Sequence, residues 1–194
     1  DGTVVETHGD RENLFRLFLL CNDRASPTEN ALAEKGEAER AYAPEPRVAE
    51  VPFDSKRKYM ITVHKTKSGY LSVLKGAPDV ILPMCRGAAG AAEKASEMAQ
   101  RALRVLGFAY AETETLPAAP EKLSYTFCGL AGLIDPPRAE SYEAVKACRR
   151  AGIKVVMITG DHADTAVAVA RSIGICGDRE SAVTESELLA MEEP

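Results

Sequence analysis

The spacing of apolar and polar residues along the chain changes twice, and each change marks a different kind of element. In the first part, apolar residues recur at helical spacing over residues 13–22, with Asp10 placed to cap the helix. A second helix is predicted from Ser26, which can cap it, until Gly36 ends it. The Ala-, Glu- and Pro-rich residues 37–46 then predict a solvated connection.

The second part of the chain changes to the two-residue period of strands. Short runs rich in β-branched and aromatic residues alternate with turns, and the Lys-Ser-Gly triplet at residues 67–69 predicts a hairpin. The predicted strands are residues 48–53, 59–65, 70–75, 108–112 and 125–133, and the predicted helices are residues 77–84 and 87–106. Together they indicate an antiparallel sheet with helices, an α+β layer.

After the double proline at residues 136–137 the pattern changes again. The predicted elements are helices at residues 140–151, 164–173 and 188–191 and a strand at residues 153–158. The strand is a nearly continuous apolar run between two helices, as in a buried parallel sheet, so we expect a Rossmann-like half unit. The predicted fold class is therefore α/β, with one domain at residues 1–133 and a second at residues 134–194.

Composition narrows the function without identifying it. The chain has 194 residues, of which 45% are hydrophobic, and 24 Lys and Arg against 29 Asp and Glu give a formal charge of −5. A mildly acidic chain without Trp is a poor candidate for nucleic-acid binding. Five scattered Cys indicate a reducing, cytosolic compartment, and three separate His show no zinc-ligand spacing. No apolar run approaches the ~20 residues that cross a bilayer, so we expect a soluble segment. The abrupt start and the end at Met191-Glu192-Glu193-Pro194 lead us to expect a segment cut from a longer protein.

One motif at the end of the predicted strand 153–158 could bind phosphate. Thr159-Gly160-Asp161 follows the carboxyl end of that strand, where ligands of open α/β sheets bind. The glycine allows close approach of the backbone, and the free amides at a helix start can hold an anion. Taken alone, the motif more often forms only a turn and a helix cap.

Three further positions have both a chemical and a structural interpretation. Phe53, followed by three cations at residues 56–58, could stack on a base, but the residues alone favour a core Phe and a solvated turn. Lys75 before Gly76 could point into a cleft, or the pair could form a tight turn. Arg104, near the end of a predicted helix, reads by itself as a surface cation.

Several motifs occur in one order along nearly the whole chain. They are Ser26-Pro27-Thr28-Glu29-Asn30-Ala31-Leu32, Phe53-Asp54-Ser55-x-Arg57-Lys58, Lys75-Gly76-Ala77-Pro78-Asp79, Asp135-Pro136-Pro137-Arg138 and Met157-Ile158-Thr159-Gly160-Asp161-His162. Their order and spacing resemble the cytosolic head of P-type cation-transporting ATPases of the calcium or sodium/potassium pump type. The coincidence of several ordered motifs outweighs the separate structural alternatives.

The resemblance implies a nucleotide-binding domain followed by part of a phosphorylation domain of the haloacid-dehalogenase type. The implied nucleotide-binding residues are Glu29, Phe53, Lys58, Lys75, Gly76, Arg104, Thr159, Gly160 and Asp161, and the implied hinge is Asp135, Pro136, Pro137 and Arg138. In the family the ring at the position of Phe53 stacks on adenine, with Glu29 at the adenine edge and Arg104 reaching toward the phosphates. Lys58 and Lys75 line the same pocket, and the residues from Thr159 meet the terminal phosphate when the domains close.

Two family motifs are missing from this sequence. It lacks the Asp-Lys-Thr-Gly-Thr loop that supplies the nucleophile and the Gly-Asp-Gly-x-Asn-Asp loop that helps to hold Mg²⁺. We therefore expect the chain to bind ATP or ADP but to form no aspartyl-phosphate, with no catalytic or metal-ligating residue of its own. The parent would be a membrane pump that hydrolyses ATP with Mg²⁺, and its remaining parts would be the partners of this segment.

Likeness to bacterial calcium pumps makes calcium the expected ion, although the ion ligands would lie in membrane helices that this sequence does not contain. Two other functions stay open. One is a non-catalytic regulatory or interaction module that has lost nucleotide binding. The other is a haloacid-dehalogenase-type phosphatase, which would need an Asp-x-Asp motif near the start of the second domain, where the sequence has none.

Overall fold

The computed structural model describes residues 2–101, 103–134, 138–159 and 163–177, together with residues 183, 187, 188 and 191. The chain divides into two compact units, Asp1–Ser96 with Arg104–Asp135 and Glu97–Leu103 with Pro136–Pro194. The elements of the first part are β1 (Thr3–Gly9), α1 (Arg11–Leu20), α2 (Pro27–Ala38), β2 (Arg47–Asp54), β3 (Tyr59–Lys65), β4 (Tyr70–Gly76), α3 (Pro78–Ile81), η1 (Leu82–Met84), β5 (Cys85–Arg86), α4 (Ala91–Gln100), β6 (Arg104–Thr113), η2 (Pro120–Lys122) and β7 (Tyr125–Ile134). They are followed by α5 (Ala139–Arg150) and α6 (Ala163–Ser172).

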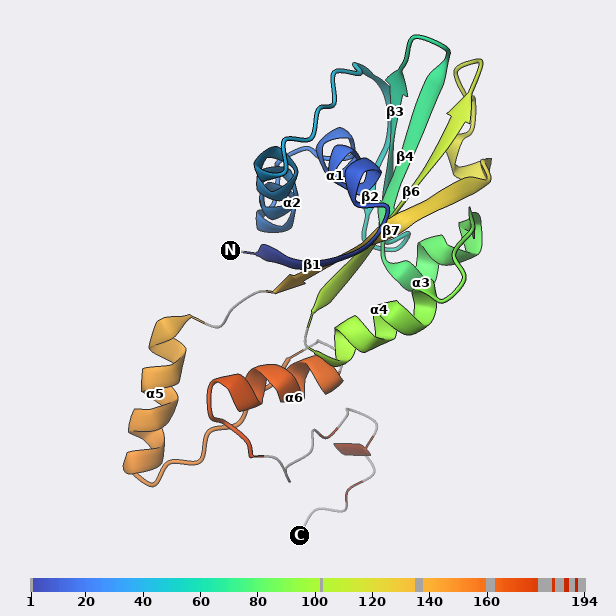
Figure 1. Ribbon diagram of the computed structural model, residues 1–194. Helices are drawn as coiled ribbons and strands as arrows, with labels where there is room; N and C mark the ends of the chain where they lie inside the picture. Colours follow the sequence, from blue (N-terminus) through green and yellow to red (C-terminus); the bar gives the residue numbers. More distant parts are fainter. Residues whose placement is uncertain are drawn as a thin grey trace. The chain divides into compact units, whose positions relative to one another are not determined.

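Among the described residues, seven strands form one sheet in the order β1-β7-β6-β4-β3-β2, with β5 attached to β7 outside this path (Figure 1). The strands pair antiparallel except β5, which runs parallel to β7. Tyr59 of β3 pairs with Gly76 of β4, and Gly76 pairs with Gly107 of β6. The start of β3, the end of β4 and the start of β6 therefore meet at one end of the sheet. The predicted mixed fold with an antiparallel sheet is confirmed.

Two hydrophobic clusters fill the two faces of this sheet. On one face α1 and α2 pack against the strands, so that Phe18, Leu32 and Met60 share one buried cluster. On the other face Ile61 and Ile81, from β3 and α3, belong to the second cluster. Met60 and Ile61 are neighbours in β3 and point to opposite faces, as the two-residue period of a strand requires. Burial of both faces at roughly 25 cal/mol per Å² of apolar surface is the main stabilisation of this unit.

Local capping explains where the first two helices begin. The side chain of Asp10 accepts a hydrogen bond from the backbone N–H of Asn13 at 3.4 Å, and α1 starts at the next residue. Ser26 Oγ accepts from the backbone N–H of Glu29 at 3.3 Å, and Pro27 occupies the first position of α2. Both starts lie within a few residues of the predicted ones, because a cap is encoded in the three or four residues that form it.

The predicted end of the second helix at Gly36 is wrong. α2 continues through Gly36 to Ala38. A Cβ at Gly36 would lie 3.0 Å from both Leu19 Cδ2 and the carbonyl oxygen of Phe15. The glycine therefore permits the close packing of α2 on α1 and does not end the helix, a reason that spacing along the chain cannot reveal.

Two strands depart from the predicted pattern. β1 was not predicted, since Val4 is its one buried apolar residue and its other positions are partly or fully exposed. The helix predicted over residues 87–106 is too long: α4 ends at Gln100 and Arg104 begins β6. The residues from Arg104 onward form a strand because they pair with β4 and β7 and bury Phe108 in the core. Tertiary pairing has overridden the helical preference of the Ala-rich stretch.

The second unit contains α5 and α6, as the helical spacing predicts. The strand predicted at residues 153–158 is wrong for the described structure: Ile153, Val156 and Ile158 are 57%, 69% and 94% exposed and belong to no strand. A strand needs partners, and the described residues of this unit contain none. The half unit of Rossmann type is thus not observed, and the predicted terminal helix at residues 188–191 falls partly outside the described residues.

Candidate functional site

Most of the predicted site residues of the first unit gather at the same end of the sheet. Gly76 is the last residue of β4, Arg104 is the first of β6, and Phe53 lies one residue before the end of β2. Lys58 directly precedes β3, and its carbonyl oxygen accepts a hydrogen bond from Ala77 N–H at 3.0 Å, next to the end of β4. The topology therefore brings together side chains that lie far apart in the sequence.

Lys75 and Glu29 form the centre of this region. The ammonium of Lys75 donates to Glu29 Oε1 at 2.8 Å, and the two side chains are 8% and 13% exposed. A buried charge without a partner is costly, so each group requires the other in the absence of a ligand. One of the two interpretations of Lys75 was a cation with a free ammonium in a cleft; in the structure the ammonium is held by Glu29 in the first turn of α2.

The second oxygen of the Glu29 carboxylate is also held. Glu29 Oε2 accepts a hydrogen bond from the backbone N–H of Ala25 at 3.0 Å. With Lys75 on the other oxygen, the carboxylate has a donor on each side and a fixed plane. Each oxygen keeps a further lone pair that can accept one more hydrogen bond.

Phe53 is 63% exposed, so the interpretation as a core phenylalanine is wrong. The turn that follows it is built around Asp54, whose carboxylate accepts the backbone N–H groups of Lys56 and Arg57 at 2.9 and 3.0 Å. These hydrogen bonds lower the pKa of Asp54 below its ordinary value. The turn leaves one aromatic face and several cations exposed at the end of the sheet.

Gly76 and Lys58 approach each other closely in this turn. Lys58 has a φ of +58°, a conformation that L residues rarely adopt. A Cβ at Gly76 would lie 2.7 Å from the carbonyl oxygen of Lys58 and from Tyr59 Cβ. Only glycine fits at this strand end, which gives a structural reason for Gly76 beside its proposed role in a ligand site.

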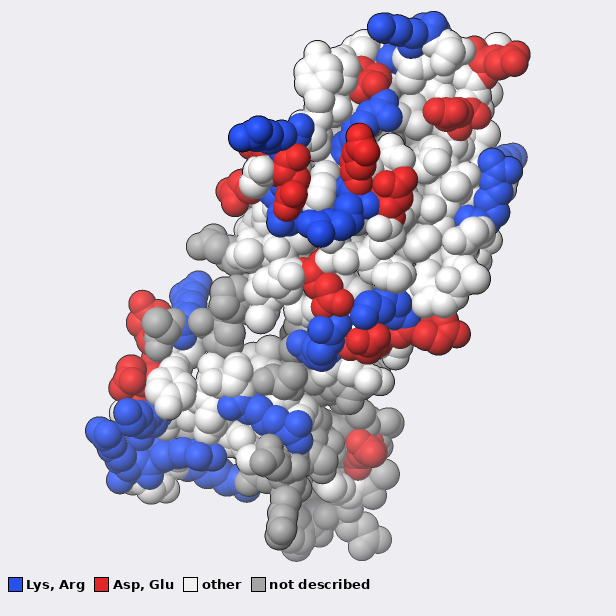
Figure 2. Space-filling view, viewed as in Figure 1, with Lys and Arg blue, Asp and Glu red and all other residues white. Residues whose placement is uncertain are grey.

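Arg104 connects the start of β6 to the start of α2. Its guanidinium donates to Thr28 Oγ1 at 3.3 Å, and Thr28 directly precedes Glu29. The expectation that Arg104 lies on a helix is wrong, but the strand brings this cation beside the Glu29 turn. Figure 2 shows acidic and basic side chains interleaved over the face of α1 and α2, with no single-sign patch there.

The remaining predicted residues belong to the second unit or lie outside the described ranges. Thr159 and Arg138 are exposed. Gly160, Asp161 and the hinge residues Asp135, Pro136 and Pro137 fall outside the described residues, so the phosphate and hinge predictions are not tested. Among the residues that the structure does describe, no group of three or more His, Cys, Asp or Glu side chains could hold a metal ion.

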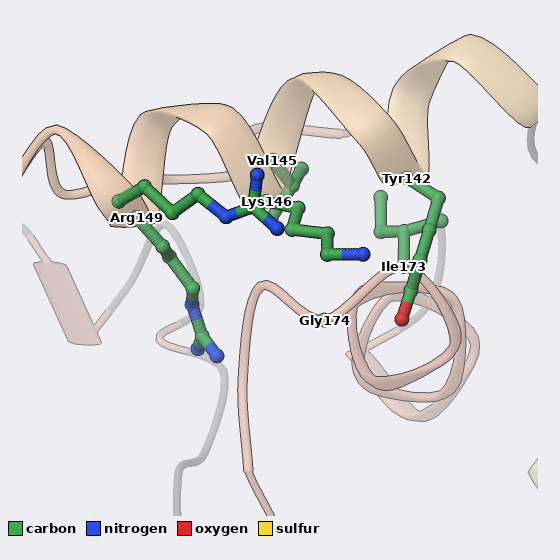
Figure 3. Close-up of a pocket in the computed structure, with 7 residues that line it drawn as sticks. Tyr142, Val145, Lys146, Arg149, Ile173 and Gly174 are labelled. Atoms are coloured by element: carbon green, nitrogen blue, oxygen red, sulfur yellow. The ribbon is translucent and has the colours of Figure 1, made fainter.

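A cavity of about 340 Å³ lies within the second unit, between α5 and the end of α6. It is lined by Tyr142, Val145, Lys146, Arg149, Arg150, Ile173 and Gly174, whose arrangement is shown in Figure 3. Cations of α5 form much of its rim, and Arg149 donates to the carbonyl oxygen of Ile175 at 3.2 Å. None of the predicted nucleotide-binding residues lines this cavity.

Two side chains that hold the backbone around Glu29 were not among the residues predicted from the sequence. Asn22, in the turn between α1 and α2, donates to the carbonyl oxygen of Glu29 at 2.7 Å. Arg47 of β2 donates to the carbonyl oxygen of Asn22 at 2.8 Å and forms an ion pair with Asp23. No periodicity or spacing signals these contacts, because each joins residues that only the tertiary fold brings together.

Comparison with known proteins finds a matching family and curated relatives. A family model described as "P-type ATPase, cytoplasmic domain N" matches residues 18–140. Calcium-transporting ATPase 1 of Bacillus cereus is 38% identical over 194 residues, covering 85% of this chain and 22% of that protein. Calcium-transporting ATPase 1 of Lactococcus lactis is 33% identical, covering 96% of this chain and 25% of that protein.

A third relative, probable cation-transporting ATPase F of Mycobacterium tuberculosis, is 38% identical, covering 85% of this chain and 21% of that protein. The chain thus spans roughly a quarter of the length of the curated relatives it matches. No described helix is both long and apolar enough to cross a membrane. The family match covers more than half of the chain and includes α2 and the strands from β2 to β7. The chain therefore belongs to the P-type cation-transporting ATPase family, and residues 18–140 match its cytoplasmic domain N.

Proposed function

We propose that this chain binds ATP or ADP at the end of the sheet where β2, β3, β4 and β6 meet, as the nucleotide-binding part of a P-type cation pump. The observation that carries the proposal is the buried Glu29–Lys75 pair at the same sheet end as the exposed ring of Phe53. An acceptor, a buried cation and an exposed aromatic face are the groups that purine nucleotides need.

Each group has a distinct role in the proposed complex. The ring of Phe53 stacks on adenine, an interaction worth roughly 1–3 kcal/mol per base. The Glu29 carboxylate accepts from the exocyclic amine of adenine, using a lone pair that its present partners leave available. Lys58 and Lys75 line the same pocket, and Arg104 reaches toward the phosphates, to which it can donate charge-assisted hydrogen bonds. Gly76 adds no side chain at this strand end.

The residues of the second unit complete the proposal. Thr159, Gly160 and Asp161 would meet the terminal phosphate when the two domains close around the nucleotide, and Asp135, Pro136, Pro137 and Arg138 would form the hinge. We assign no role to the cavity under α5. These parts of the proposal rest on the family resemblance, since most of these residues lie outside the described ranges.

We further propose that the parent protein is a membrane pump that hydrolyses ATP and transports calcium. Two of the relatives above are named calcium-transporting ATPases, which supports calcium as the ion. This 194-residue chain contains no Asp-Lys-Thr-Gly-Thr loop and would not form the aspartyl-phosphate by itself. Mg²⁺ would be needed by the parent, but the described residues of this chain do not form a site that fits it.

A calorimetric titration of the 194-residue chain with ATP tests the nucleotide-binding role. We expect a high-micromolar to millimolar dissociation constant, about −4 to −5 kcal/mol, because one stacking ring and a few cations form only half of a closed site. ADP should bind similarly, and GTP more weakly because its 6-oxo group would face the Glu29 carboxylate. The absence of any saturable heat at about 10 mM ATP, a concentration above the expected dissociation constant, would contradict the proposal.

A further inference from the structure

We propose that Asn22 is a positioning residue that orients the Glu29 carboxylate, and thereby sets the preference of the site for adenine over guanine. The inference rests on the proposed function, since the orientation of Glu29 affects recognition only if a purine binds there. Asn22 lies in the turn between α1 and α2, and its side-chain amide takes part in three hydrogen bonds to the backbone.

The amide nitrogen of Asn22 joins the end of α1 to the beginning of α2. Its Nδ2 donates to the carbonyl oxygen of Phe18 at 3.0 Å and to the carbonyl oxygen of Glu29 at 2.7 Å. The Phe18 carbonyl belongs to the last turn of α1, where carbonyl groups have no backbone N–H partner within the helix. One side chain therefore satisfies a helix end and fixes the backbone of Glu29 at the same time.

The amide oxygen of Asn22 shapes the loop that leads to Glu29. Oδ1 accepts from the backbone N–H of Arg24 at 2.8 Å, closing a turn in which Arg24 takes a φ of +53°. The next N–H in the chain, that of Ala25, donates to Glu29 Oε2 at 3.0 Å. Asn22 thus holds both the backbone of Glu29 and the loop donor that sets the plane of its carboxylate.

The backbone of Asn22 is itself tied to the sheet. Arg47 of β2 donates to the carbonyl oxygens of Asn22 and Leu20 at 2.8 and 3.3 Å. The same guanidinium forms ion pairs with Asp23 and, at 2.8 Å, with Glu50. The turn is held to β2 on one side and to α2 on the other, so Asn22 gives the sheet a second hold on Glu29, beside the direct ion pair with Lys75 of β4.

A carboxylate with a fixed plane can tell adenine from guanine. At position 6 adenine carries an amine that donates, whereas guanine carries an oxygen that accepts, and an oxygen facing a carboxylate is repelled. A carboxylate that can rotate loses this repulsion and can instead accept from the 2-amino group of guanine. A site built around a hydrogen bond discriminates strongly only while that group stays in place.

Asn22→Ala and Asn22→Asp test the inference in the 194-residue chain. Asn22→Asp keeps the acceptor for Arg24 but places an oxygen against the carbonyl groups of Phe18 and Glu29. The matched control is Asn13→Ala, which removes a side-chain amide that donates to Asp10 Oδ2 at 2.7 Å at the other end of α1. Dissociation constants for ATP and GTP are measured by calorimetry well below the melting temperature, and melting temperatures are recorded in parallel.

We expect the ratio of ATP to GTP affinity to fall by on the order of tenfold in both Asn22 variants, about the value of one hydrogen bond to a charged group, and to stay unchanged in Asn13→Ala. A lower melting temperature with an unchanged ratio would overturn the inference, because a purely structural role predicts that result. If Asn22→Ala does not fold, Asn22→Ser replaces it, because serine keeps a short acceptor but cannot bridge both carbonyl groups. The same fall in the ratio of ATP to GTP affinity is expected for Asn22→Ser, and an unchanged ratio would overturn the inference. No saturable ATP binding by the unsubstituted chain would instead overturn the proposed function, and this inference with it.

Discussion

The ammonium of Lys75 lies 2.8 Å from the Glu29 carboxylate, in an ion pair that joins residues 46 positions apart and is almost fully buried. Lys75 comes from the end of β4 and Glu29 from the first turn of α2, so the pair connects the sheet to the helix that covers it. The same two side chains are candidates to contact a nucleotide. Stability and the proposed binding therefore depend on one ion pair. A variant of either residue must be tested for both its free energy of unfolding and its nucleotide affinity.

Removing one partner of this pair should destabilise the fold. Lys75→Met leaves the Glu29 carboxylate buried without its cation, and we expect the free energy of unfolding to fall by about 3 kcal/mol. The double variant Lys75→Met/Glu29→Leu should lose less, because neither charge is then left alone. Urea denaturation measures both.

Lys35→Met is the matched control for Lys75→Met. It removes the more exposed pair of Lys35 with Glu39, at 2.7 Å and with both side chains 33% exposed, and should lower the free energy of unfolding far less than Lys75→Met. Equal losses in Lys35→Met and Lys75→Met would show that burial of the Glu29–Lys75 pair has no energetic consequence.

Phe53→Ala should separate a binding ring from a structural one. Since the ring is 63% exposed, its removal should leave the melting temperature nearly unchanged while ATP binding weakens by roughly 1–3 kcal/mol. Tyr42→Ala, at an aromatic residue that is 77% exposed in the connection before β2, should change neither. A large fall in melting temperature with intact binding in the folded fraction would assign Phe53 to the core and the pocket elsewhere.

The isolated chain should not be phosphorylated. Incubation with radiolabelled ATP and Mg²⁺ should leave no acid-stable label, because the sequence has no Asp-Lys-Thr-Gly-Thr loop to supply the nucleophile. Label is counted after acid precipitation, with an acylphosphate distinguished by its lability to hydroxylamine. Stoichiometric labelling would mean that another residue acts as the phosphate acceptor.

His64 makes stability depend on pH. The residue is 3% exposed, with Nδ1 3.0 Å from the carbonyl oxygen of Glu45 and Nε2 2.9 Å from Thr62 Oγ1. Because a carbonyl only accepts, the proton of the neutral His64 ring lies on Nδ1. Burial lowers the pKa of His64 below its ordinary value of 6.5, and the nearby charge of Arg47 acts in the same direction.

The unfolded chain therefore takes up a proton at His64 before the folded chain does. This contribution to stability is complete above the unfolded pKa and is lost as pH falls through the lower folded pKa, so unfolding should become easier as pH falls below about 6.5. His64→Gln should flatten this slope in urea denaturation, whereas His8→Gln, at an exposed position of β1, should not. An unchanged slope in His64→Gln would assign the pH dependence to other groups.

Elements with local signals were predictable from the sequence. Asp10 and Ser26 cap helices within three residues. Runs rich in β-branched and aromatic residues identified β3 and β4, in which successive residues are buried on both faces of the sheet. Arg104 was misplaced because an Ala-rich stretch precedes it, while its strand is decided by pairing with Leu133 on β7. The prediction of a strand at residues 153–158 was wrong. A continuous apolar run indicates a preference for burial, but it does not show whether neighbouring strands are present.

The candidate site shows the same division. Glu29, Phe53 and Lys75 were identified from ordered motifs, and Arg104 from the resemblance that those motifs carry. The pairing of Lys75 with Glu29 was not predicted, because 46 residues separate them. Asn22 was also missed, since its hydrogen bonds go to backbone groups and leave no pattern of side-chain types. What remained hidden were the contacts that only the tertiary fold creates.

The central claim is that a nucleotide binds at the end of the sheet that carries Gly76. The most direct measurement is an NMR titration of the uniformly ¹⁵N-labelled 194-residue chain with ATP, following each backbone amide. We predict saturable shifts concentrated at the first turn of α2, the turn at residues 54–58 and the end of β4, with the hairpin at residues 65–70 unaffected. Shifts confined to the cavity between α5 and α6, or no saturable shifts at millimolar ATP, would contradict the account.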